Sequence, residues 1–131
     1  MNDNTVRIGS ASGFWGDTAS AAPALVEGGH LDYLVFDYLA ELTMSILAAA
    51  PSKNPDLGYA TDFVTVTMKS ILKDVVARNI KVISNAGGVN PQACANAIRA
   101  MAAEQGLDVR IAVVLGDDVL PQIASLRTEG V

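Results

Sequence analysis

Between residues 80 and 105 the chain reads IKVISNAGGVNPQACANAIRAMAAEQ, a short strand, a glycine turn and a helix. The run Ile80–Ser84 is rich in β-branched residues, as strands of a parallel sheet are. Asn90 is a favoured N-cap and Pro91 a favoured first helical residue, so a helix is predicted to follow them. The segment is therefore read as one strand–helix unit.

The same order of strand and helix recurs along the chain. The strand-like runs are Thr5–Ile8, Asp32–Phe36, Ile80–Ser84 and Arg110–Leu115, and the helical segments are 18–27, 42–50, 62–79, 92–105 and 119–127. Such alternation indicates a parallel sheet with right-handed crossovers. The predicted fold is α/β, a mostly parallel sheet of about four strand–helix units, doubly wound. A segment of a (β/α)₈-type barrel is the alternative, and residues 1–131 are expected to form one α/β domain.

Composition excludes several classes of protein. Half of the 131 residues are hydrophobic, which excludes an intrinsically disordered chain. Fourteen acidic residues against nine basic ones give a net charge of −5, so the basic stripe of a nucleic-acid-binding module is not expected. The single cysteine, Cys94, excludes a disulfide framework, and the single histidine, His30, excludes a histidine-rich zinc site built from this chain alone.

The chain is expected to be cytoplasmic and not to cross a membrane. The first residues lack the positive and apolar regions of a secretory signal. The most apolar window, 33–50, is interrupted by Asp37 and Glu41, whereas a spanning helix needs about 20 predominantly apolar residues.

Ligands of parallel α/β proteins bind beyond the carboxyl ends of the strands, so the segments that leave the predicted strands are candidate binding sites. The first segment, Gly9–Asp17, holds three glycines that suit close approach to a phosphate or carboxylate. The alternative is a tight turn with Asp17 as a helix cap and with Trp15 in the core. The candidate substrate-binding residues here are Ser10, Gly13, Trp15, Gly16 and Asp17.

Two carboxylates follow the second strand. Asp37 and Glu41 are four residues apart, and both would lie on one side of a helix that began directly after the strand. Such a pair is a candidate metal ligand set or a catalytic acid and base. The alternative is that both only stabilise a helix N-terminus, where negative charge contributes about 0.3–1 kcal/mol.

The third and fourth strands are also followed by candidate residues. Asn85, Gly87 and Gly88 are candidate substrate-binding residues, because glycines permit close approach of a ligand to the backbone. Asn90 is included with them, although a structural role as helix cap is favoured for it. In the pair Asp117 and Asp118 one carboxylate suffices as a cap, so the other is a weak sign of a polar or metal contact.

The carboxyl edge of the predicted sheet should be electronegative, since no Lys or Arg directly follows any predicted strand. A divalent metal is one possible source of the missing positive charge, and basic groups of a partner segment are another. We therefore expect a homo-oligomer or a second chain that completes the fold. Cys94 is expected to be a buried, inert thiol and His30 a surface residue.

Three strings of residues in register resemble a known family. IGSASGFWGD at 8–17, DYLVFDYLAE at 32–41 and VISNAGGVNP at 82–91 are similar to the start of the acyclic terpene utilisation (AtuA) family. The resemblance extends from about Arg7 to Leu126. Members of that family are longer, so this chain resembles an N-terminal portion of the family domain.

The resemblance implies a role in breaking down branched acyclic terpenoids through acyl-CoA intermediates, with hydratase or lyase chemistry suggested. It also implies that the Gly9–Asp17 loop, Asp37, Glu41 and the Asn85–Asn90 loop line the site. In that interpretation Asp37 or Glu41 is the general base, and backbone amides of the glycines bind a substrate oxygen. The alternative is a non-catalytic small-metabolite-binding module or a subunit of a split enzyme.

Overall fold

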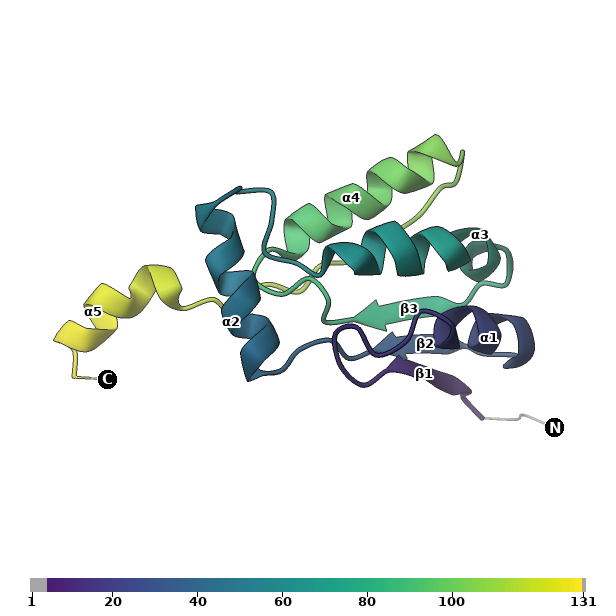
Figure 1. Ribbon diagram of the computed structural model, residues 1–131, viewed down its shortest axis with the longest axis horizontal. Helices are drawn as coiled ribbons and strands as arrows, with labels where there is room; N and C mark the ends of the chain where they lie inside the picture. The colour runs from purple at the N-terminus through teal and green to yellow at the C-terminus, as the bar shows by residue number, and fades with distance from the viewer. Residues whose placement is uncertain (1–4, 131) are drawn as a thin grey trace.

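The computed structural model describes residues 5–130. Its centre is a three-stranded sheet of β1 (Ile8–Ser12), β2 (Tyr33–Phe36) and β3 (Lys81–Ser84). The strands are parallel and lie in the order β1-β2-β3, so their carboxyl ends meet at one edge (Figure 1). The prediction of an α/β protein with a parallel sheet is confirmed.

The helices connect the strands in the predicted order. They are α1 (Ala21–Gly28), α2 (Glu41–Ala49), η1 (Ala50–Ser52), the π-helical η2 (Phe63–Met68), α3 (Lys69–Ala77), α4 (Pro91–Glu104), η3 (Leu120–Gln122) and α5 (Ile123–Thr128). Helix η2 runs directly into α3, so together they form the single long helix that the sequence predicts. Within residues 5–130 no helix has the length and apolar character needed to cross a bilayer.

The sheet is packed on one face. Leu34 and Phe36 of β2 are buried under the helices, and Leu34 is 0% exposed. Alternate residues of a strand point to opposite faces, and on the other face Ile8 and Ile83 are exposed. The strands follow in sequence order throughout residues 5–130, without the reversal of order that marks the switch point of a doubly wound sheet.

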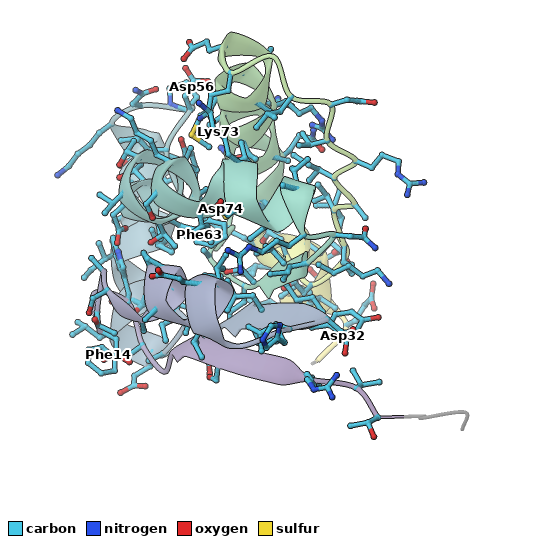
Figure 2. The ribbon with its side chains drawn as sticks, turned by 90° about the vertical axis from the view of Figure 1, so that its right-hand side faces the viewer. Phe14, Asp32, Asp56, Phe63, Lys73 and Asp74 are labelled. Carbon is cyan, nitrogen blue, oxygen red and sulfur yellow. The ribbon has the colours of Figure 1, made fainter. Side chains whose placement is uncertain are left out.

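The core lies between the sheet and the η2–α3 helix. Phe36, Tyr38 and Phe63 form an aromatic cluster, with centroid separations from Phe63 of 5.3 Å to Phe36 and 5.6 Å to Tyr38. Figure 2 shows Phe63 among the helices and Phe14 on the outside of the molecule. This cluster joins the exit of β2 to the helix that precedes β3.

The first strand begins later than predicted. β1 covers Ile8–Ser12 and not Thr5–Ile8, so most of it consists of small residues. A Cβ atom added to Gly9 would lie 2.6 Å from a methyl group of Leu31, which shows how closely the chain approaches at this point. Gly9 is buried beside Leu31, and the β-branched residues Thr5 and Val6, which suggested a strand, lie just before β1.

The predicted fourth strand is wrong. Residues 110–115 are extended but belong to no strand, and α4 is followed by a return of the chain beside β3 (Figure 1). Val109 packs against the core, and exposed and half-buried residues alternate from 107 to 114. The guanidinium of Arg99 donates to the carbonyl oxygen of Ile111 at 3.4 Å, and this segment forms no ladder with β3.

Candidate functional site

The exits of the three strands are tied together by side-chain hydrogen bonds. The Asn85 Nδ2 atom donates to Asp37 Oδ1 at 2.7 Å, and the Tyr38 backbone N–H donates to Asn85 Oδ1 at 2.7 Å. The Ser12 hydroxyl donates to the carbonyl oxygen of Asp37 at 3.2 Å. The prediction that residues following different strands meet at this edge therefore holds for Asp37 and Asn85.

These bonds orient the Asp37 carboxylate. Its Oδ1 atom also accepts from the Leu39 N–H at 3.4 Å, which closes a short turn after β2. The side chain is exposed, and Oδ2 accepts no hydrogen bond from residues 5–130. One oxygen is thus held in place and the other is available to a ligand.

Glu41 is not the helical partner of Asp37 that its spacing suggested. The helix does not begin directly after β2, because Ala40 is extended with φ −145° and α2 starts at Glu41 itself. The two carboxylates therefore do not share a helical turn. Glu41 is exposed in the first turn of α2, where its charge is favourable toward the helix dipole.

The loop after β1 is closed by its own carboxylate. The Gly13 N–H donates to Asp17 Oδ2 at 3.0 Å, and the Asp17 N–H donates to the Phe14 carbonyl at 3.3 Å. Gly16 has φ +85°, a conformation that favours glycine. Asp17 is not a helix cap, since α1 begins at Ala21 after Ser20. The Gly13 amide is already bonded within the chain, whereas that of Gly16 bonds to none of the described residues.

Trp15 connects this loop to the η2 helix. Its indole Nε1 donates to Asp62 Oδ1 at 2.6 Å, across 47 residues of sequence. Trp15 is half-buried and packs against the core, which is one of the two placements expected from the sequence. The hydrogen bond of Trp15 to Asp62 was not predicted, because an aspartate just before a helix is indistinguishable in sequence from a cap.

A buried polar pair under the site was also missed. The Tyr38 hydroxyl and Thr67 Oγ1 are 3.4 Å apart inside the core. Burial raises the pKa of the Tyr38 phenol and the charge of Asp62 adds to this, while the bond from Thr67 lowers it. Thr67 lies in the π-helical turn, and such turns occur often at functional sites. Nothing in the apolar periodicity of 62–79 distinguishes this turn from α-helix.

The glycines after β3 are required by packing. A Cβ atom at Gly88, where φ is +53°, would lie 2.5 Å from Leu47 Cδ1 and 2.6 Å from the Gly58 carbonyl. A Cβ atom at Gly87 would lie 2.6 Å from Pro91. The Gly88 N–H donates to the Asn85 carbonyl at 3.1 Å, so of the two amides only that of Gly87 has no partner among the described residues.

Asn90 has the structural role that was favoured for it. Its side-chain oxygen accepts from the Ala93 N–H at 3.2 Å, and Pro91 is the first residue of α4. Its Nδ2 atom donates to the carbonyls of Pro55 and Leu57 at 3.0 and 2.9 Å. Asn90 thus fastens the 55–57 loop to the start of α4.

The remaining candidates lie away from this edge. Ser10 is within β1 and not in the following loop, so its side chain is on the exposed face of the sheet. Asp117 and Asp118 are exposed near η3, beyond the segment that forms no strand. Within residues 5–130 no three His, Cys, Asp or Glu side chains are close enough to hold a metal ion.

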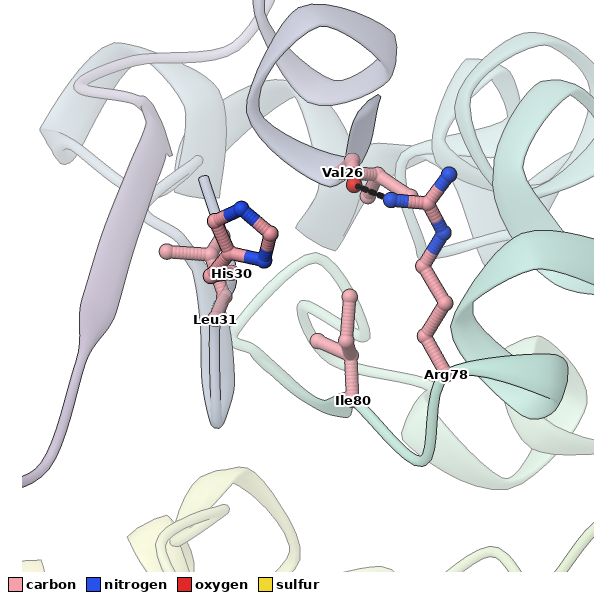
Figure 3. A pocket seen from close by; sticks show the side chains of 5 residues that line it. All are labelled: Val26, His30, Leu31, Arg78 and Ile80. Atoms are coloured by element: carbon pink, nitrogen blue, oxygen red, sulfur yellow. Dashed lines mark hydrogen bonds between the residues drawn. The ribbon is translucent and has the colours of Figure 1, made fainter. Parts of the chain in front are cut away.

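Cys94 and His30 are where they were expected. Burial raises the pKa of the Cys94 thiol from 9.0 to about 11, and His30 is exposed after α1. His30 lines a hollow of about 420 Å³ together with Val26, Leu31, Arg78 and Ile80 (Figure 3). Arg78 Nη1 donates there to the Val26 carbonyl at 2.8 Å, which places this hollow by the start of β3 and not by Asp37.

A second hollow of about 410 Å³ lies beside the first two turns of α4. Polar and apolar surface contribute about equally to its lining, which comprises Pro55, Asp56, Tyr59, Asn90, Gln92, Ala93, Asn96 and Ala97. The carboxylates of Asp37 and Glu41 do not line it. Both side chains are exposed.

The comparisons with known proteins identify a family. Residues 6–131 match the family described as acyclic terpene utilisation family protein AtuA. No curated protein and no solved structure is similar enough to be matched. The match spans the three strands, the Asp37–Asn85 pair and the Trp15 loop, so the chain belongs to the acyclic terpene utilisation (AtuA) family.

Proposed function

We propose that the carboxyl edge of this sheet binds a branched acyclic acyl or terpenoid substrate and takes part in hydratase or lyase chemistry on it. The observation that carries the proposal is the hydrogen bond between Asn85 and Asp37, which leaves one carboxylate oxygen directed to solvent at the strand ends. Membership of the AtuA family supports the class of substrate.

Asp37 is the proposed general base. In hydration the group takes a proton from water as the water oxygen bonds to the β-carbon, and it then returns that proton to the α-carbon; in the reverse elimination it takes the α-proton beside the carbonyl and returns it to the departing hydroxide. A carboxylate with one oxygen fixed and the other accessible suits either step. Glu41 remains the second candidate, at the first turn of α2.

Apolar side chains near the same edge suit a branched hydrocarbon chain. Phe14 is exposed in the loop after β1, and Leu42 and Ile46 are exposed on α2, which follows β2. The amides of Gly16 and Gly87 are the backbone donors proposed for a substrate carbonyl or carboxylate. No step of this proposal depends on a metal ion.

The second candidate function is a non-catalytic module that binds a small metabolite, or one subunit of a split enzyme. What favours it is the shortage of catalytic side chains: one exposed histidine, one buried thiol, and no Lys or Arg directly after β1, β2 or β3. That the chain is the N-terminal part of a longer domain, and that it is cytoplasmic, both stay predictions.

Turnover of a methyl-branched unsaturated acyl-CoA by the purified chain tests the proposal. We expect Asp37→Asn to lower kcat at least ~100-fold, the usual contribution of a general base. Asp74→Asn, at an exposed position of α3, is the matched control and should retain activity, whereas loss of turnover in Glu41→Gln but not in Asp37→Asn would assign the base to Glu41. Saturable binding without turnover in the unaltered chain would favour the non-catalytic module.

A further inference from the structure

Within the part of the chain that the structure describes, one face of the sheet is uncovered. This open face consists of Ile8, Ser10, Tyr33, Val35, Lys81 and Ile83, which alternate along the strands with the buried residues. Ile8 is 63% exposed and Ile83 is 53% exposed. Parallel sheets are almost always covered on both faces, so an apolar face of this kind indicates a missing partner.

The end of the chain is similarly uncovered. Residues 114–130, the C-terminal arm, leave the body of the molecule, and α5 lies apart from it in Figure 1. Val114 is 92% exposed, and Leu115, Val119 and Leu120 are also exposed. A short helix preceded by exposed apolar residues has little to stabilise it unless it packs on another surface.

The solvent-accessible surface area of the chain agrees with an uncovered sheet face and an uncovered C-terminal arm. A compact monomer of 13.6 kDa exposes about 6,600 Å² by the usual scaling of surface with mass. This chain exposes 8675 Å², roughly 2,000 Å² more. If each of two copies buried its excess surface against the other, the interface would bury about 4,000 Å² in total, which is within the range of obligate homodimers.

We propose that a second copy of this chain covers the open face and the C-terminal arm, with the strands of the two sheets antiparallel about a two-fold axis. The charges on the open face favour this orientation. Lys81 is the first residue of β3. Asp37 comes two residues after Val35, just beyond the carboxyl end of β2. Antiparallel stacking brings unlike charges together, whereas parallel stacking would bring the two Lys81 side chains to the same end.

The second copy supplies the cation that the carboxyl edge lacks. Lys81 Nζ now lies 5.0 Å from the centroid of the Tyr33 ring and donates to its hydroxyl at 3.3 Å. Stacked sheets are about 10 Å apart, so the partner's Lys81 can extend to the Asp37–Asn85 pair. This part of the inference rests on the proposed function, because it makes the partner's Lys81 a positioning residue for an anionic or carbonyl group bound at Asp37.

The mass in solution tests the interface, by sedimentation and native mass spectrometry over about 1–100 μM. We expect the unaltered chain to have twice the monomer mass. Ile83→Asp should weaken the dimer at least ~100-fold, because a buried unpaired charge costs several kcal/mol. Val66→Asp is the matched control, since Val66 is 48% exposed on η2 and outside the open face, and it should leave the mass unchanged. Comparable circular dichroism of the two variants shows that both fold.

A charge reversal tests the orientation. Lys81→Glu should weaken the dimer ~10-fold or more, and the double variant Lys81→Glu/Asp37→Lys should restore it to within about threefold. An unaltered chain that is monomeric, or that pairs only with a different polypeptide, overturns the proposal, as does a dimer that withstands Ile83→Asp. Failure of the double variant to restore the dimer overturns the antiparallel arrangement. A dimer that binds no acyl thioester would support the proposed interface and contradict the proposed function. A monomer that binds an acyl thioester would contradict the interface and support the function.

Discussion

The side-chain amide of Asn85 bonds to two consecutive residues at the exit of β2, donating to the carboxylate of Asp37 and accepting from the backbone N–H of Tyr38. Both donor–acceptor distances are 2.7 Å. One residue at the end of β3 therefore fixes the direction of the Asp37 side chain and the path of the chain into the aromatic core.

Asn85→Ala should lower the free energy of unfolding by about 1–3 kcal/mol, because the part-buried Tyr38 N–H loses its partner. Chemical denaturation measures this. Asn96→Ala is the control: Asn96 is exposed on α4, and among residues 5–130 its side chain bonds to those of Gln92 and Arg99 alone, so its loss should cost less than about 0.5 kcal/mol. Equal effects of the two substitutions would show that Asn85 does not join the strand exits.

Asp62→Ala should release the Trp15 loop from the η2 helix. The bond from the indole to a carboxylate is charge-assisted, and its loss should cost about 1.5–3 kcal/mol and shift Trp15 emission to longer wavelength. Trp15 is the only tryptophan, so its emission reports this loop alone. Asp74→Ala, at an exposed position of α3, should change neither quantity. An unaltered emission spectrum in Asp62→Ala would contradict the bond.

The sequence was sufficient to predict the units around β2 and β3. Apolar β-branched runs give both strands, and the Asn90–Pro91 helix start is determined by local chemistry alone. It was not sufficient for β1, because that strand consists mostly of small residues, which have low strand propensity. Residues 110–115 have the composition of a strand, yet strand formation needs a paired edge as well as β propensity.

For the site, the sequence identified segments that do meet at the strand exits, but not which of their residues are hydrogen-bonded to one another. Asp37 and Asn85 were both candidates, and their hydrogen bond depends on the register of two strands, which sequence spacing does not reveal. Glu41 was paired with Asp37 on the condition that a helix begins directly after β2, but Ala40 is extended and α2 starts at Glu41. Asp62 and Thr67 were missed because their contacts lie across long separations in sequence.

Gly88→Ala should destabilise the protein by about 2–4 kcal/mol, since φ is +53° and the added methyl would meet both Leu47 and the Gly58 carbonyl. Gly16→Ala separates conformational strain from steric conflict. Gly16 also has positive φ, +85°, but nothing lies within 4 Å of the added Cβ, so the cost should be about 1 kcal/mol. Thermal unfolding of the two variants compares them, and a Gly16 effect as large as that of Gly88 would refute the packing argument.

Stability should fall as the pH rises from about 9 to about 11, in part because of Cys94. In the folded chain burial raises the pKa of this thiol to about 11, so it keeps its proton where the unfolded chain, with a thiol pKa near 9.0, releases it. The free energy of unfolding should drop by about 1–3 kcal/mol over this interval. Cys94→Ala should show a shallower decline in the same denaturation series, and identical slopes would contradict the effect of burial.

Titration of the unaltered chain with a methyl-branched acyl-CoA, followed by Trp15 emission, tests most directly the claim that the carboxyl edge is a binding site. We predict a saturable change, weaker binding of the straight-chain thioester of equal length by roughly 3–10-fold, and no response to coenzyme A alone. Asn85→Ala should weaken binding about tenfold through the loss of an oriented Asp37. Binding that is the same in Asn85→Ala and Asp37→Ala as in the unaltered chain, or no change in emission at all, would contradict the account.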